Sequence, residues 1–172
     1  MSEWLTGTAE RSRTALDAVR EQWATARTPP GRLAQHVFPS LDGTGLFFYT
    51  QWTSDAAHLA WARAQRSGLV DRVDTLVPGI ERPGLTRTRL VRSVVHDARR
   101  PARLFAVRRM PAAAAEAAVT PSAPGLLAAH LHLTPDGERA VVITEWTDAA
   151  ATGDTGAKWY TGLEEHRCSG RR

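Results

Sequence analysis

Histidine, tryptophan and arginine side chains in three strand-like segments are the residues of this sequence that could do chemistry. His36 lies in the first segment, and an imidazole, whose unperturbed pKa is near ~6.5, can remove a proton from a phenol. Trp52 closes the second segment, and its indole N–H can only donate a hydrogen bond. Arg87, Arg89 and Arg92 follow in the third and carry fixed positive charge. Proton removal beside fixed positive charge suits a site that forms and stabilises an organic anion.

Other kinds of site find little support in the sequence. His130 and His132 are two residues apart and share a strand face, but no third metal ligand is evident nearby. The Gly43–Gly45 segment is expected to be a hairpin turn and not a nucleotide-binding loop. Cys168 is the single cysteine, which excludes an intrachain disulfide and a thiolate metal cluster. We expect no metal site, and we expect His58 and His132 at the surface.

The sequence contains an internal repeat. Residues 30–55 and 124–149 align without a gap at an offset of 94, with ten identities in 26 positions. The identities include turn residues, which a compositional bias toward alanine and arginine does not explain. The matched pairs are Pro30/Pro124, Gly31/Gly125, Leu33/Leu127, Ala34/Ala128, His36/His130, Asp42/Asp136, Gly43/Gly137, Thr50/Thr144, Trp52/Trp146 and Thr53/Thr147.

The first copy and its flanks predict a complete small unit. Pro-Gly opens the repeat as a turn, and Asp42-Gly43 predicts a hairpin turn because glycine accepts the positive φ that such turns need. Apolar residues recur at helical spacing before and after the hairpin. The predicted elements are a strand over 3–7, a helix over 9–27, strands over 33–38 and 46–52, a helix over 55–66 capped by Thr53 or Ser54, and a strand over 86–95. This order is the split βαβ, ferredoxin-like arrangement.

The second copy is predicted to be shorter. After a linker over 97–102 we expect a strand over 103–110, a short helix over 112–119 and the strands 127–133 and 140–146. Residues 152–166 contain three glycines and show no clear final strand. The predicted class is α+β, with two tandem ferredoxin-like units, 1–97 and 103–172. They would form one intramolecular, pseudo-dimeric α/β barrel, the second unit being abbreviated.

The repeated motif resembles the antibiotic biosynthesis monooxygenase (ABM) domain family. The resemblance rests on a Pro-Gly strand, an Asp-Gly turn and a return strand ending in QWTS or EWTD before a helix, followed by PGIERPG and a strand. It covers most of residues 1–95 and, more weakly, 103–150. It implies ferredoxin-like units that pair into dimeric α/β barrels.

The resemblance also implies an activity. Some members oxidise aromatic polyketides such as anthrones with O2 and no metal or flavin, and the substrate must then supply the electrons. We therefore expect a cofactor-independent monooxygenase that acts on a polycyclic aromatic intermediate of antibiotic or pigment biosynthesis. Two alternatives stay open. One is haem binding or degradation, for which His58 is the only candidate ligand; the other is a non-catalytic accessory subunit.

Aromatic residues of the return strand are expected to bind the substrate. Trp52 corresponds to the family tryptophan, whose N–H would donate to a substrate carbonyl or to oxygen, and Trp146 is its repeat mate. Strand alternation puts Phe48 and Thr50 on the face of Trp52 and Tyr49 on the other. If the cavity lies on the Trp52 side, Phe48 and Thr50 line it and Tyr49 lies between the two sheets. The alternative for each tryptophan is a place in the core.

The resemblance implies an arginine on the last strand that steadies an anionic intermediate. The order of preference is Arg89, Arg92, Arg87, and alternation puts Arg87 and Arg89 on one face and Arg92 on the other. His36 is the candidate general base. His130 occupies the equivalent position, and a residue kept in both copies is also explained by a structural role. Surface ion pairs are the alternative for the arginines.

Bulk composition fits a globular protein whose partners are small molecules. The 172 residues carry a net charge of +4, and all but one of the 22 basic residues are arginine. The charges are interspersed, which argues against nucleic-acid binding. The sequence shows neither a secretory signal nor an apolar run long enough to span a bilayer, so we expect a cytoplasmic protein without membrane contact. Self-association into a homo-oligomer is left open.

Overall fold

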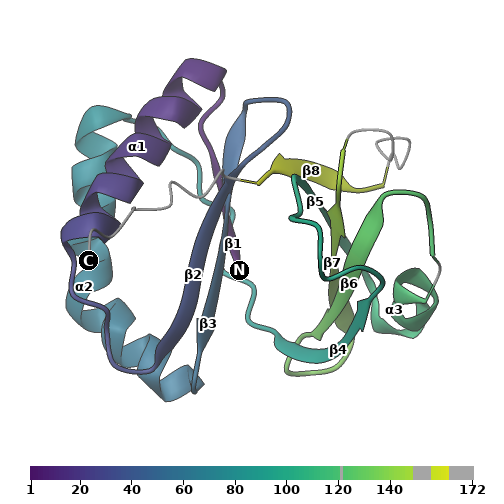
Figure 1. Ribbon diagram of the computed structural model, residues 1–172. Coiled ribbons are helices and arrows are strands. Elements are labelled where there is room, and N and C mark those ends of the chain that lie inside the picture. Colours follow the sequence, from purple (N-terminus) through teal and green to yellow (C-terminus); the bar gives the residue numbers. More distant parts are fainter. Residues whose placement is uncertain (121, 149–155, 163–172) are drawn as a thin grey trace, which may run out of the picture.

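The fold has two antiparallel sheets, and its helices lie on their outer faces (Figure 1). The computed structural model describes residues 1–120, 122–148 and 156–162. The first sheet has the strand order β1 (Ser2–Leu5), β3 (Gly45–Trp52), β2 (Arg32–Pro39). The second has the order β4 (Arg89–Val95), β6 (Leu126–Leu133), β7 (Arg139–Trp146), β5 (Leu104–Pro111), β8 (Lys158–Thr161). The predicted α+β class is therefore confirmed.

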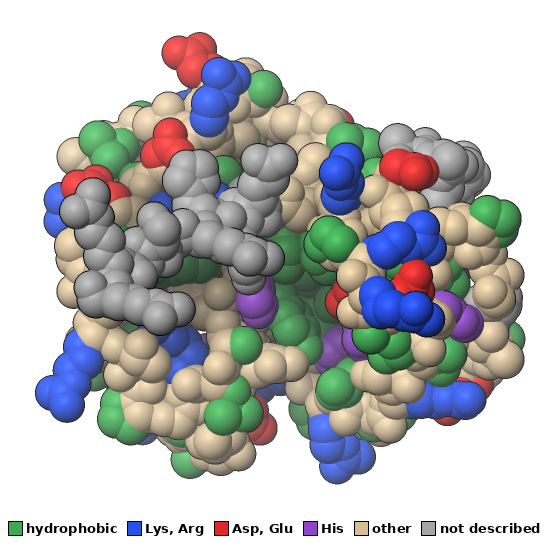
Figure 2. Space-filling view, viewed as in Figure 1, with side chains coloured by type: hydrophobic (Ala, Val, Ile, Leu, Met, Phe, Trp, Pro, Cys, Tyr) green, Lys and Arg blue, Asp and Glu red, His purple; other side chains and the backbone are tan. Residues whose placement is uncertain are grey.

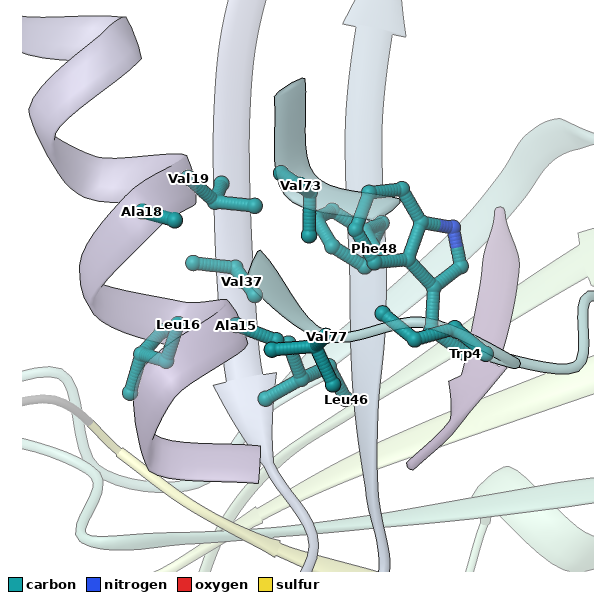
Figure 3. Close-up of a cluster of buried hydrophobic side chains, with 11 residues drawn as sticks. Trp4, Ala15, Leu16, Ala18, Val19, Val37, Leu46, Phe48, Val73 and Val77 are labelled. Atoms are coloured by element: carbon teal, nitrogen blue, oxygen red, sulfur yellow. The ribbon is translucent and has the colours of Figure 1, made fainter. Parts of the chain in front are cut away.

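Two helices cover the first sheet. Helix α1 (Ala9–Thr25) begins at Thr8, whose hydroxyl accepts a hydrogen bond from the Arg11 amide, and α2 (Asp55–Leu76) begins at Ser54 in the same way. Both pack on the outer face of β3, where Leu46 and Phe48 are buried (Figure 3). Figure 3 shows the helix side chains that meet them, namely Ala15, Leu16, Ala18 and Val19 of α1 and Val73 of α2.

A short helix covers the second sheet. Helix α3 (Ala112–Val119) has the predicted bounds and packs through Ala115 and Val119 on the outer face of β6 and β7. In the described part of the chain no helix is long and apolar enough to cross a lipid bilayer.

The inner faces of the two sheets bury each other. Phe47 of β3 and Tyr160 of β8 are almost fully buried there, with ring centroids 5.1 Å apart. Beside them the Glu3 carboxylate accepts a hydrogen bond from the Tyr160 hydroxyl and pairs with Arg109 (3.2 Å) and Lys158 (3.0 Å). Burial alone would raise the pKa of Glu3, but the hydrogen bonds from Tyr160 and Lys158 and the two positive charges hold it below its usual value. Residues of β1, β5 and β8 are thus tied together across the interface.

Strand ends cross between the sheets. Residues 81–86 run beside β1, with hydrogen bonds between Leu5 and Glu81 in both directions and from the Thr86 amide to the Met1 carbonyl. The same segment then enters the second sheet as β4, which pairs with β6. From the other side, the Leu41 amide after β2 donates to the Trp159 carbonyl of β8 at 2.8 Å. The first half of the chain therefore forms backbone hydrogen bonds with the second sheet at two places, through β4 to β6 and through Leu41 to β8.

The two hairpins of the repeat have matching backbones. Gly31 and Gly125 both have φ of 83°, and Gly43 and Gly137 have φ of 73° and 74°. The strand pairing is interrupted at equivalent places, between Arg32 and Ala34 and between Leu126 and Ala128. In each hairpin the amide of the residue after the tryptophan donates to the carbonyl of the first glycine. Thr53 donates to Gly31 at 2.8 Å, and Thr147 donates to Gly125 at 3.0 Å.

Two predicted elements differ from the structure. Helix α2 continues ten residues beyond the predicted end at Arg66, to Leu76. The prediction that the second copy has no final strand is wrong, because Lys158–Thr161 forms β8. This strand is short and follows a glycine, so its local pattern is weak, and its pairing with β5 and the burial of Tyr160 stabilise it. Cys168 and most of residues 152–166 lie outside the described residues.

The matched glycines allow a controlled test of the hairpins. A Cβ at residue 31 would lie 2.7 Å from the Ala57 Cβ of α2, whereas at residue 125 the nearest atom is the Thr147 hydroxyl at 3.1 Å. We expect Gly125→Ala to lower the free energy of unfolding by about 1–2 kcal/mol through its positive φ, and Gly31→Ala to cost about 1–3 kcal/mol more through overpacking. Urea unfolding measures both; equal losses would contradict the close approach of α2 to the first hairpin.

Candidate functional site

A cavity of about 490 Å³ opens at the end of β3. Its lining comes mainly from two segments, residues 49–55 and residues 85–90, with Met1, Leu33, His58 and His132 completing it. The volume lies within the roughly 300–1,000 Å³ typical of small-molecule sites. The face shown in Figure 2 is hollowed between the two sheets, and hydrophobic and histidine side chains gather in the hollow.

Trp52 lines this cavity and carries an unpaired hydrogen-bond donor. Its ring packs against those of His58 and Trp61, with centroids 5.3 Å and 5.4 Å away. Its Nε1 atom is buried and has no hydrogen-bond partner among the described residues. A buried donor without a partner costs about 1–3 kcal/mol, so an acceptor on a bound molecule would be favoured at this position.

His58 and Arg87 lie beside Trp52. His58 is half-buried on the first turns of α2, so its prediction as a surface residue is wrong. Burial, and then the positive charge of Arg87, lower the pKa of His58 below its usual value. The imidazole is therefore neutral at neutral pH and can accept a proton. The Arg87 guanidinium lies 4.0 Å from the Asp55 carboxylate and is partly open to solvent.

A hydrogen-bonded chain crosses from one sheet to the other within the cavity wall. Gln51 donates from Nε2 to the Tyr49 hydroxyl at 2.8 Å, and that hydroxyl lies 3.1 Å from His132 Nε2 on β6. Since the hydroxyl already accepts from Gln51, its own proton is free for His132, which then carries its proton on Nδ1. Burial raises the pKa of Tyr49 and lowers that of His132 to about 4, so both groups are neutral.

The burial of His132 corrects a second sequence-based expectation. The residue was predicted at the surface, but it is only 3% exposed. Tyr49 of β3 meets its ring from the other sheet, and Leu90 of β4 is its pairing partner along the backbone. Both come from parts of the chain far away in sequence. Tyr49 lies between the sheets and also lines the cavity, whereas the expectation put it on the face away from a cavity lined by Phe48.

Four predicted site residues do not line the cavity. Phe48 is buried in the helix-facing core against Trp4, at 4.5 Å between ring centroids. His36 is exposed and stacks on Phe38 and Tyr49. The remaining two, Trp146 and Arg92, are occupied elsewhere: the indole of Trp146 donates to the Thr144 hydroxyl at 2.8 Å, and Arg92 pairs with Glu116 of α3 at 2.6 Å.

A bulge in β4 changes which arginines share a face. The pairing register shifts between Leu90 and Arg92, so Arg89 lies opposite Leu133 and Arg92 opposite Leu131. Leu131 and Leu133 both pack on α3, which puts Arg89 and Arg92 on the same face of the sheet. The expected alternation is therefore wrong. Arg89 still contributes to the cavity lining, together with Arg87 and Thr50.

The described residues hold no group of three or more His, Cys, Asp or Glu side chains placed to bind a metal ion. His130, which the sequence paired with His132, instead contacts the Ser93 hydroxyl at 2.9 Å and the Glu145 carboxylate at 3.1 Å. These three side chains lie on adjacent strands and fix the orientation of the His130 ring.

Comparisons with known proteins bear on the fold. No family model matches the chain, and no curated protein matches it. The crystal structure of an anthrone oxidase-like protein superposes with a TM-score of 0.63 at 12% identity, over 95% of this chain and 90% of the other. Proposed monooxygenases from Lactobacillus acidophilus and Fusobacterium nucleatum superpose with TM-scores of 0.50 and 0.51 at 12% and 11% identity, over 86% of this chain and 75% and 74% of theirs.

These likenesses establish a shared fold. The chain is an α+β protein whose antiparallel sheets are consistent with the ferredoxin-like arrangement that the strand order predicted. In the second sheet the strand order β8-β5-β7-β6 is consistent with that of a ferredoxin-like sheet, and in the first sheet residues 81–85 run beside β1, which is followed by β3 and β2.

The buried His132 makes the free energy of unfolding depend on pH. Because its pKa is about 4 in the folded protein and near 6.5 when unfolded, the unfolded chain binds an extra proton between these pH values. We expect the free energy of unfolding to fall as the pH falls through this window, by up to about 3 kcal/mol from this group. His132→Leu should remove that part of the fall and His36→Leu, at an exposed site, should keep it. Parallel pH profiles for the wild type and His132→Leu, from urea unfolding at each pH, would contradict the assignment.

Proposed function

We propose that this protein is a cofactor-independent monooxygenase that oxidises an electron-rich, polycyclic aromatic of polyketide type with O2, and that the 490 Å³ cavity is its active site. The observation that carries the proposal is the buried Trp52 N–H, which has no partner among the described residues and lies beside His58 and Arg87. A donor and a fixed positive charge next to a neutral base are what the reaction requires.

The reaction needs no electrons from a cofactor. When an anthrone becomes a quinone, one oxygen atom of O2 enters the ring carbon and the other leaves as water with the two hydrogens of that carbon. The substrate is most easily oxidised after it has lost a proton. The site must therefore remove a proton, stabilise the anion and hold the reduced oxygen species in a water-poor environment.

The side chains around the cavity divide these tasks. The neutral His58 imidazole accepts the substrate proton. Arg87 offsets the negative charge that results, and its proximity to His58 and Asp55 favours it over Arg89 and Arg92 for this role. The Trp52 N–H donates to the substrate carbonyl or to reduced oxygen. Tyr49, held by Gln51 and His132, and Thr50 border the bound ring system.

The matched hairpins support a second part of the proposal. We infer that residues 1–97 and 103–172 are tandem ferredoxin-like units that pair within one chain as a pseudo-dimeric barrel. The equal φ values at Gly31 and Gly125 and the backbone hydrogen bonds that β4 and Leu41 form with the second sheet favour it. Only the first unit is assigned a site, because in the second the Trp146 N–H is already bonded to Thr144.

The two equivalent tryptophans give a matched test. Oxygen uptake with 1,8-dihydroxyanthrone should exceed the rate without protein, and Trp52→Phe should lower kcat roughly 10²-fold, the usual effect of removing one donor to a developing anion. Trp146→Phe should leave the rate near that of the wild type. Equal rates for the wild type and Trp52→Phe would count against this site. Absence of any uptake, by a folded protein, would favour an accessory role, and a Soret band on haem titration would favour haem chemistry.

A further inference from the structure

A second, smaller cavity of about 250 Å³ lies on the helix-covered side of the first sheet. The end of α1, the middle of α2 and the start of β2 enclose it. The side chains that matter for its chemistry are Gln22, Trp23, Arg27, Arg32, Trp61 and Arg72. No carboxylate is among its lining residues.

Two residues that line this cavity carry buried donors without partners among the described residues. The Trp23 Nε1 and Gln22 Nε2 atoms are both inaccessible to solvent and form no hydrogen bond with the described residues. Native proteins leave few buried polar groups unpaired, and each costs about 1–3 kcal/mol. Both residues line the cavity, and a ligand that carries more than one acceptor oxygen would pair these donors once the two side chains turned toward it.

Three guanidinium groups give the cavity a positive potential. Arg27 and Arg72 form no ion pair with any described residue, and both are exposed at the mouth. Arg32 is partly buried, which lowers its pKa, and it donates to the Gln35 side chain. Three positive charges around one small space, with no acidic side chain in the lining, attract an anion.

Indole rings form the apolar walls. Trp23 packs edge-on against Phe48 in the core, with centroids 6.1 Å apart, and Trp61 forms the other wall. Trp61 also contacts Trp52, so this ring separates the small cavity from the 490 Å³ cavity. A flat aromatic ring fits between indole walls better than a fully hydrated inorganic ion does.

We propose that this small cavity binds an aromatic carboxylate. Its ring lies between Trp23 and Trp61, and its carboxylate accepts hydrogen bonds from Trp23 Nε1 and Gln22 Nε2 and pairs with Arg27, Arg32 and Arg72. The proposal is independent of the oxidation assigned to the larger cavity, because it concerns different residues and requires no turnover.

Isothermal titration calorimetry with 2-naphthoate tests the site in the full chain. The wild type should bind one equivalent, with an affinity that falls as salt is added. The double variant Arg27→Gln/Arg72→Gln changes exposed residues that the fold does not need, and it should weaken binding by about tenfold or more. Trp23→Phe, which removes the donor and keeps an aromatic ring, should also weaken binding. Arg13→Gln, an exposed residue of α1 outside the lining, is the matched control and should bind as the wild type does.

Three results would overturn the proposal. Uncharged 2-naphthamide binding as tightly as 2-naphthoate would exclude the role of the arginines. Inorganic phosphate binding with the same affinity would show a general anion site without the aromatic part. Loss of naphthoate binding in Arg87→Gln, but not in Arg27→Gln/Arg72→Gln, would place the ligand in the larger cavity.

Discussion

Mutual burial of the two inner sheet faces is the constraint on which the rest of this structure depends. Phe47 and Tyr160 are buried between the two sheets. If either were exposed to water, the protein would lose most of the free energy that burial of a large aromatic side chain contributes. The Glu3 carboxylate lies in the same interface, and it can stay ionised there only because Arg109, Lys158 and the Tyr160 hydroxyl meet it. Residues 81–95 run from the side of β1 to the side of β6 and form backbone hydrogen bonds with both strands. This one segment therefore links the two sheets.

The candidate active site is a consequence of this arrangement. At the end of β3 the aromatic packing between the sheets gives way to the 490 Å³ cavity, and the Tyr49–His132 hydrogen bond joins the two sheets at its wall. The same burial that excludes water keeps His132 neutral and lowers the pKa of His58. The site proposed for anion chemistry lies where the buried interface meets the positively charged segment that contains Arg87 and Arg89.

Local patterns in the sequence predicted the two hairpins and pointed to Trp52 as a candidate residue. The cavity residues that the sequence did not indicate are placed by contacts between distant segments. Gly31 and Gly43 adopt positive φ, which glycine allows most easily. Glycines at the equivalent positions 125 and 137 therefore predicted the same turn conformations in the second hairpin. His132 looked exposed because the strand whose Tyr49 meets its ring, β3, belongs to the other half of the chain. The bulge between Leu90 and Arg92 left no clear mark in the sequence, and strict alternation therefore misassigned the arginines. His58 could have been found from its spacing of three residues from Trp61 on one helical face.

Isotope labelling tests the proposed chemistry most directly. Chelator-treated, flavin-free protein would be given 1,8-dihydroxyanthrone under ¹⁸O2, and the product analysed by mass spectrometry after subtraction of the reaction without protein. Oxidation by the substrate's own electrons predicts one ¹⁸O atom in each quinone molecule. A product whose new oxygen comes from water, or one that forms only after metal or flavin is added, would contradict it.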